Sequence, residues 1–152
     1  MFKRVLLCYD GSDAGRRVLK TGVEVATLVG AQVFVLSIVP AVIGTVSAAH
    51  AADSFGNSDF EFGYRQLLQE SIEWLQTRGV SAEGQLARGN AIDQIIAYAE
   101  QIDADLIVVG HYPQAKGGRW WSGLQRASLA ERSKCSVLIA VADINGDSAT
   151  SS

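Results

Sequence analysis

The first residues that could do chemistry are Asp10-Gly11-Ser12, which follow an apolar run ending at Tyr9. A carboxylate at the tip of a strand, then glycine and a helix-capping residue, would form a polar pocket edged by backbone N–H groups. Asp10 could accept hydrogen bonds from a base or ribose, or help to hold a cation. The alternative is that Asp10 and Ser12 only shape the turn and cap a helix. These three residues alone favour that alternative, because such caps are common.

A second candidate is the segment from Gly110 to Leu124, which opens with Gly110-His111 and contains Gly117-Gly118. A glycine-containing loop between a strand and a helix N-terminus is a typical place for phosphate, through backbone N–H groups and the helix dipole. The segment has neither the Walker A pattern nor the G-x-G-x-x-G fingerprint, so it is a weak signal alone. His111 could contact phosphate or transfer a proton, but an ordinary loop histidine is the favoured reading.

The histidines and cysteines form no recognisable metal or redox motif. His50 and His111 are far apart and belong to no H-E-x-x-H or Cys/His cluster. Cys8 lies within an apolar run and Cys135 directly precedes another, so structural roles are expected for both. Two cysteines, with no export signal at the N-terminus, favour the reducing environment of the cytoplasm.

The elements that would position these residues follow from apolar patterning. Four apolar runs of strand length do not alternate with polar residues, which is typical of strands buried on both faces of a parallel sheet. A fifth, polar strand is expected at 83–88. Helical spacing of apolar residues separates the strands, with Asn90 as the expected N-cap of the third helix and Gly30 and Gly79 as stops. The four apolar runs are 5–9, 33–36, 106–109 and 137–141.

This alternation predicts an α/β domain with a parallel sheet and helices on both faces. Ligands of such sheets bind beyond the carboxyl ends of the strands, so the residues after the first, second and fourth strands are the ones to inspect. The connection 40–59 is either functional or a simple surface excursion. Residues 143–152 are small and polar, and are expected to be a disordered tail.

Composition agrees with one globular domain. The chain has 152 residues, of which 48% are hydrophobic and 19% charged, and its net charge is −3. This balance excludes a disordered chain and makes nucleic acid a poor partner. No apolar run approaches the roughly 20 residues that span a membrane, so no membrane association is expected.

Four segments, 5–12, 89–91, 104–110 and 135–139, occur along the chain in a characteristic order and spacing. In this order and spacing the chain resembles the universal stress protein family, whose domain is called UspA-like. The resemblance extends from about Phe2 to Val141 and gives a domain at 1–142. It implies an adenine nucleotide alpha hydrolase-like fold, a single α/β domain whose five-stranded parallel sheet has the order 3-2-1-4-5.

The resemblance also implies an adenine-nucleotide site. Nucleotide-binding members carry the loop G-x2-G-x9-G-[S/T], whose positions here are Gly110, Pro113, Gly123 and Leu124. The outer glycines match. Proline has no N–H to offer a phosphate and cannot adopt positive φ, and leucine has no hydroxyl. Trp120-Trp121 are also bulkier than usual in this loop.

The same likeness places Asp10 and the backbone of Ile38 against adenine and ribose, so the base half of the site is retained. The candidate nucleotide-binding residues are Asp10, Ile38, Gly110, His111, Gly123 and Leu124. No catalytic or metal residue is assigned. ATP or AMP, with Mg²⁺, is the candidate ligand, and the altered loop favours weak or absent ATP binding.

The last strand is expected to be an apolar sheet edge, which invites pairing. Family members usually pair this edge between two subunits, which implies a homodimer. The expected interface residues are Ser136, Val137, Leu138, Ile139, Ala140 and Val141. The predicted function is a stress-response regulatory protein acting mainly through protein partners that the sequence does not identify. The alternative is an adenine-nucleotide-binding stress protein, at most with slow ATP hydrolysis.

Overall fold

The computed structural model of this chain describes residues 1–11, 13–39, 54–111 and 123–141. Strands and helices alternate along these residues, as the sequence predicts. The elements are β1 (Arg4–Cys8), α1 (Asp13–Val29), β2 (Gln32–Val39), α3 (Ser54–Thr77), β3 (Ala82–Arg88), α4 (Ala91–Gln101), β4 (Leu106–His111), α5 (Gly123–Arg132) and β5 (Ser136–Val141).

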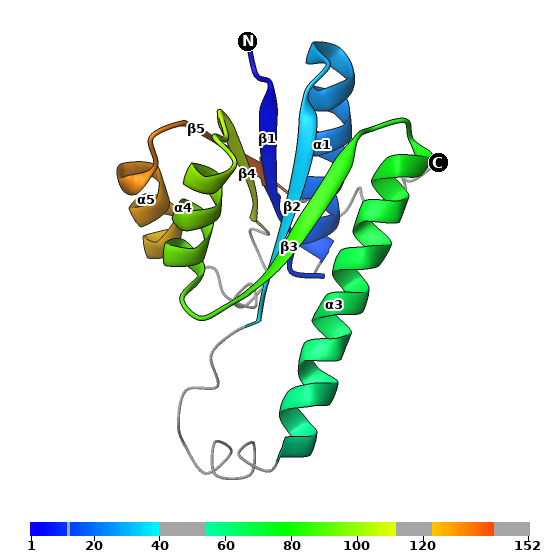
Figure 1. Ribbon diagram of the computed structural model, residues 1–152. Helices are drawn as coiled ribbons and strands as arrows, with labels where there is room; N and C mark the ends of the chain where they lie inside the picture. The colour runs from blue at the N-terminus through cyan, green and yellow to red at the C-terminus, as the bar shows by residue number, and fades with distance from the viewer. Residues whose placement is uncertain (12, 40–53, 112–122, 142–152) are drawn as a thin grey trace.

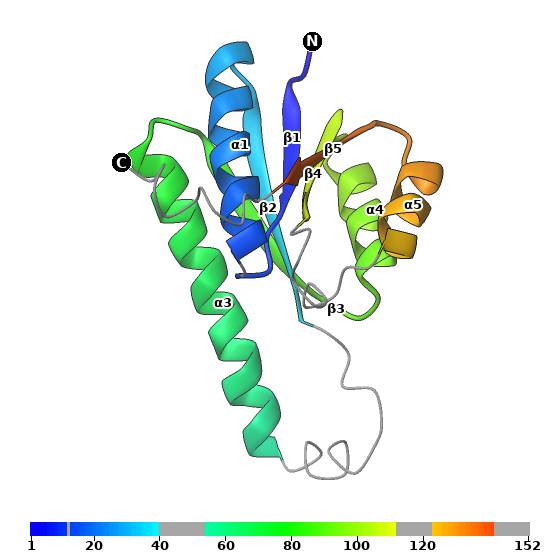
Figure 2. The ribbon, with the colours of Figure 1, turned by 180° about the vertical axis from the view of Figure 1, so that it is seen from behind.

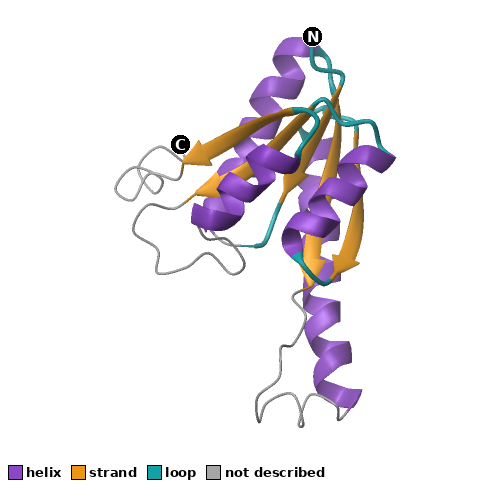
Figure 3. Cartoon of the chain, turned by 90° about the vertical axis from the view of Figure 1, so that its left-hand side faces the viewer, coloured by secondary structure: helices purple, strands orange, loops and turns teal. Residues whose placement is uncertain are grey.

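The five strands form one sheet in the order β3-β2-β1-β4-β5, and every neighbouring pair is parallel. Helices α1 and α3 cover one face of this sheet, and α4 and α5 cover the other (Figures 1 and 2). Figure 3 views the same layers from the side of α4 and α5. The predicted single α/β domain, its strand order and its parallel pairing are therefore confirmed.

Two hydrophobic clusters, one on each face of the sheet, explain why the apolar runs do not alternate with polar residues. Val5 and Leu7 of β1 face the cluster that includes the residues of α1 and α3. Leu6 and Cys8 face the cluster that includes the residues of α4. Because successive side chains of a strand point to opposite faces, a central strand covered on both sides must be apolar at every position.

The predicted helix ends agree with the structure. The side chain of Asn90 accepts a hydrogen bond from the N–H of Asp93 at 3.1 Å and caps α4. Gly30 follows α1 with φ +70°, and Gly79 follows α3 with φ +76°. Positive φ is strained for residues that carry a Cβ, so glycine is the residue suited to end these helices.

Several boundaries differ from the sequence-based expectation, and β2 continues to Val39, past the apolar run that ends at Leu36. Helix α3 begins at Ser54, so the connection predicted to run to Asp59 ends earlier. The apolar stripe that marks this helix in the sequence starts only at Phe60, and the preceding turn carries no helical signal. In Figure 1 the N-terminal part of α3 projects past the ends of the strands.

Strand β4 continues to His111, although its apolar run ends at Val109. Gly110 pairs with Ala140 and His111 pairs with Val141, so the ladder with β5 extends the strand by two residues. Gly110 and His111 are consequently the end of β4 and do not belong to the loop that follows it. The predicted tail at 143–152 lies outside the described residues.

Candidate functional site

The strand order places the topological switch point of the sheet between the carboxyl ends of β1 and β4, a region that we call the crevice. Helix α1 follows β1 and covers one face of the sheet, whereas α5 follows β4 and covers the other face (Figures 1 and 2). Neighbouring strands whose helices lie on opposite faces mark the topological switch point of a parallel α/β sheet. Ligands of such sheets bind there, and the candidate residues converge on this crevice.

Asp10 lies directly beyond β1 and its side chain is buried, with 5% of the residue exposed. Gly11 turns the chain away from the sheet with φ +81°. The hydroxyl of Ser37 donates a hydrogen bond to the carbonyl of Tyr9 at 3.1 Å, and this contact fixes the backbone at the end of β1. Asp10 therefore follows a strand end whose backbone is fixed, and its carboxylate is buried next to the first turn of α1.

Gly15, in the first turn of α1, is a site residue that the sequence reasoning missed. A Cβ at this position would lie 2.8 Å from Oδ1 of Asp10 and 2.7 Å from the ring of Tyr9. Contacts this short do not occur in proteins, so a side chain at position 15 would displace the carboxylate or the ring. The signal in the sequence is a small residue within the first helical turn after Asp10-Gly11.

Ile38 contributes to the crevice through its backbone. Its side chain belongs to the core and the residue is only 1% exposed. The carbonyl of Leu36 accepts a hydrogen bond from the N–H of Tyr9 at 3.0 Å, so Leu36 faces β1. Backbone groups of every second residue in a strand point the same way, so those of Ile38 point past the end of β1.

The pairing register brings the candidates from three strands to one level. Cys8 pairs with Leu36, and Leu7 pairs with Val108. Continued beyond β1, this register sets Asp10 level with Ile38 on one side and with His111 on the other. The three residues that the sequence singled out separately therefore converge at the switch point.

His111 is half-buried at the end of β4. Burial, and then the nearby charge of Arg126, lower the pKa of His111 below its ordinary value. A lowered pKa keeps the imidazole neutral near pH 7, where one ring nitrogen donates a hydrogen bond and the other accepts one. His111 is thus suited to hydrogen bonding in the crevice rather than to pairing as a cation.

The remaining candidates belong to the start of α5. Gly123 is the first residue of this helix and Leu124 the second, so the predicted loop does lead to a helix N-terminus. Such an end presents backbone N–H groups that favour an anion. The residues between, 112–122, include Pro113 and Trp120-Trp121 and lie outside the described residues.

The thiols are placed where the sequence suggests. Cys8 is buried in the core, and burial followed by the negative charge of Asp10 raises its pKa far above the ordinary range. Cys135 is partly buried, and burial followed by Asp105 raises its pKa as well. Both groups are protonated at neutral pH, so neither is an activated nucleophile.

Within the described ranges, no three His, Cys, Asp or Glu side chains gather in a way that could hold a metal ion. In that same part of the chain, none of the helices is both long and apolar enough to cross a lipid bilayer.

Comparison with known proteins gives this fold a family. Solved structures of universal stress proteins share this fold. The model of the universal stress protein family matches residues 1–140, and the chain belongs to this family.

A curated relative is the universal stress protein YxiE of Bacillus subtilis (strain 168). It is 28% identical over 154 residues, which cover 91% of this chain and 99% of that protein. A universal stress protein solved in complex with cAMP superposes with a TM-score of 0.63 at 22% identity, covering 93% of this chain and 98% of that one. A family protein of Arabidopsis thaliana with AMP bound gives 0.67 at 15% identity, covering 97% and 98%.

Proposed function

We propose that this universal stress protein is a stress-response regulator that acts as a homodimer, mainly through protein partners, and binds ATP weakly or not at all. The observation that carries the proposal is the apolar edge of β5, where Ile139 is 46% exposed and Val141 is 49% exposed. An apolar strand at a sheet edge, with no strand of the described residues paired beyond it, is a template for pairing with a second copy.

Weak ATP binding is proposed from the phosphate half of the crevice. Position 113 is proline and position 124 is leucine, where nucleotide-binding relatives are expected to have glycine and a hydroxyl residue. A triphosphate needs several N–H and hydroxyl donors, and each charge-assisted hydrogen bond contributes roughly 1.5–3 kcal/mol. The residues present therefore do not fit a tightly held triphosphate with its Mg²⁺.

A second function is supported by the adenosine half of the same crevice. Asp10 is buried directly beyond β1, and the backbone groups of Ile38 face the β1 side of β2. Relatives of the same fold have been solved with cAMP and with AMP, which carry one phosphate each. The second candidate is therefore a sensor of adenine mononucleotides that uses Asp10, Ile38, Gly110, His111, Gly123 and Leu124.

Thermal unfolding with ATP, ADP, AMP and cAMP, each with and without Mg²⁺, separates the two functions. A ligand present at one hundred times its Kd stabilises the folded protein by about 2.7 kcal/mol. The regulatory function predicts no stabilisation by ATP at millimolar concentration. Stabilisation by AMP or cAMP that is lost in Asp10→Asn, and kept in the exposed control Glu131→Gln, would establish the sensor instead.

The assembly is tested separately by sedimentation velocity at micromolar concentration. A symmetric dimer is expected, and a monomer would refute the proposed interface whatever the nucleotide result.

A further inference from the structure

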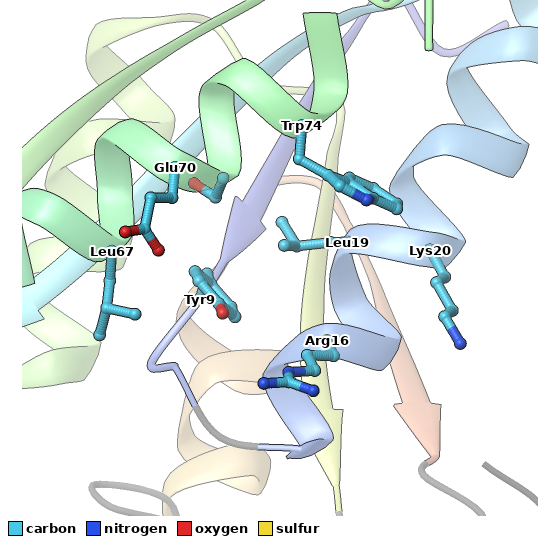
Figure 4. Close-up of a pocket in the computed structure, with 8 residues that line it drawn as sticks. Tyr9, Arg16, Leu19, Lys20, Leu67, Glu70 and Trp74 are labelled. Carbon is cyan, nitrogen blue, oxygen red and sulfur yellow. The ribbon is translucent and has the colours of Figure 1, made fainter. Parts of the chain in front are cut away.

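A cavity of about 310 Å³ lies between α1 and α3, on the face of the sheet away from α4 and α5 (Figure 4). Leu19 of α1 and Leu67 of α3 form its apolar walls, and Tyr9 reaches it from the end of β1. The volume is at the lower end of the range typical of small-molecule sites. The cavity adjoins the switch point, because Tyr9 precedes Asp10, but none of the candidate nucleotide-binding residues lines it.

One wall of the cavity is an aromatic surface that is held in place. Trp74 of α3 lines it, and the guanidinium carbon of Arg78 lies 4.0 Å from the centre of the indole ring. This cation–π contact restrains the ring. Tyr9 is 7% exposed, so its ring is also fixed by packing. Two restrained aromatic side chains favour a flat apolar guest, because little side-chain entropy is lost when it binds.

The charged groups of the cavity are arranged asymmetrically. Arg16 and Lys20 stand one turn apart on α1, whereas Glu70 comes from α3 on the opposite wall. Burial raises the pKa of the Tyr9 phenol, while the charge of Arg16 and its hydrogen bond to the phenol act against this. Two cations on one wall against a single carboxylate on the other favour an anionic group at the α1 side.

We propose that this cavity binds a small amphipathic organic anion, with a flat apolar body between Leu19, Leu67 and Trp74 and a carboxylate at Arg16 and Lys20. The site shares no lining residue with the proposed nucleotide-binding residues. Arg16 is suited to a carboxylate because its planar guanidinium can offer two parallel N–H donors, and Lys20 adds a second, mobile charge. Glu70 orients the guest by repelling its charged end.

Three probes that share a naphthalene ring and carry an anionic, a neutral or a cationic group test the site by titration calorimetry on the intact protein: naphthoate, naphthylmethanol and naphthylmethylamine. Naphthoate is expected to bind at least about tenfold more tightly than the neutral alcohol, since charge-assisted hydrogen bonds to Arg16 and Lys20 are lost in the alcohol. The amine is expected to bind more weakly still. Equal affinities, or no naphthoate binding up to about 1 mM, would overturn the proposal.

Two variants, one that removes a positive charge from the cavity and one that removes a negative charge, test where the probe binds. Lys20→Gln is expected to weaken naphthoate binding about tenfold, and Glu70→Gln to strengthen it, because each removes one lining charge. Arg17→Gln and Glu73→Gln are matched controls, since they remove the same charges from the same helices at positions that do not line the cavity. Their affinities should equal that of the parent.

Competition with AMP distinguishes this site from the crevice. Saturating AMP should leave the affinity for naphthoate unchanged. Displacement by AMP, or equal effects of Lys20→Gln and Arg17→Gln, would place the probe elsewhere and refute the assignment.

Discussion

The two edge strands of the sheet occupy equivalent positions and have opposite chemistry. Strand β3 carries Glu83, Gln85 and Arg88, and α3 packs against it. Strand β5 reads Ser-Val-Leu-Ile-Ala-Val and leaves Ile139 and Val141 about half exposed. Charged and polar residues discourage an edge from pairing with another chain, whereas an apolar edge invites it.

The side chains of β5 show where a partner would lie. Val137 packs with the cluster on the α4 and α5 face, and Ala140 packs with the cluster on the opposite face. Alternation then places Ile139 and Val141 on the same face as Val137, but at the end of the strand, where both remain exposed. The proposed dimer therefore uses the apolar β5 edge, because the polar β3 edge is less suited to pairing.

The largest effect on the proposed dimer is expected from Ile139→Asp, which places a charge on the apolar β5 edge. The change removes apolar area that the proposed dimer would bury, worth about 1 kcal/mol at each of two symmetry-related copies, and brings like charges together. The dimer dissociation constant should rise at least about 30-fold. Sedimentation equilibrium measures it, with Gln85→Asp on β3 as the control that should stay dimeric.

A second prediction concerns the covering of the β3 edge by α3. A Cβ on Gly84 would lie 2.8 Å from the Cδ1 atoms of Ile72 and Leu68, and 2.9 Å from the carbonyl oxygen of Val35. Gly84→Ala should therefore destabilise the fold by about 1–3 kcal/mol.

Gly63 is the matched control for Gly84, because it lies in α3 with no atom within 4 Å of an added Cβ. Gly63→Ala should stabilise the fold by about 0.5–1 kcal/mol through helix propensity. Urea unfolding gives both values. Equal effects of the two changes would mean that α3 does not pack closely on β3.

The third prediction makes the two edges alike. Glu83→Val combined with Gln85→Val removes the polar character of β3, and each new apolar cross-strand pair contributes about 0.2–1 kcal/mol to edge pairing. The double variant should form assemblies larger than the dimer as concentration rises, because both edges can then pair. Light scattering over a concentration series measures this. A particle size that stays at that of the parent would show that polarity is not what protects β3.

The smallest effect is expected from His111, which pairs with Val141 at the end of the β5 ladder. Its folded pKa is lowered by burial and by Arg126, so the unfolded chain binds a proton more readily. Its contribution to stability is complete above about pH 6.5 and declines as pH falls through the folded pKa. His111→Gln should lose less stability than the parent between about pH 7.5 and about pH 5.5.

His50→Gln, which changes the other histidine, is the control for this measurement. If both variants keep the acid sensitivity of the parent, the lowered pKa of His111 is not the cause of that sensitivity.

The sequence predicts most of the fold because its central strands are apolar at every position. This pattern is typical of strands that are buried on both faces of a parallel sheet. It also predicts the capping of α4 by Asn90, which depends only on neighbours three residues away. The start of α3 and the end of β4 were not predicted, because both extend past the apolar pattern. For β4 the extension is a pairing with β5, some 30 residues away in the sequence, which local propensity does not encode.

Only part of the candidate site could be predicted from the sequence, because some of its residues matter only through contacts made in the fold. Asp10 and His111 stand out as polar residues at the ends of apolar runs. Gly15 does not, because its importance comes from the ring of Tyr9 and the carboxylate of Asp10 lying against it. The cavity between α1 and α3 combines residues more than 50 positions apart, such as Lys20 and Trp74, and only the packing of the two helices brings them together.

Between the two edges lies the crevice, and the central claim is that its adenosine half is intact while its phosphate half is not. Titration calorimetry of ATP into the parent and into the double variant Pro113→Gly with Leu124→Ser tests this most directly. The variant regains one N–H and one hydroxyl for phosphate, so ATP should bind at least ~100-fold more tightly than in the parent. A parent that already binds ATP with a micromolar Kd, or a variant that gains nothing, would contradict the claim.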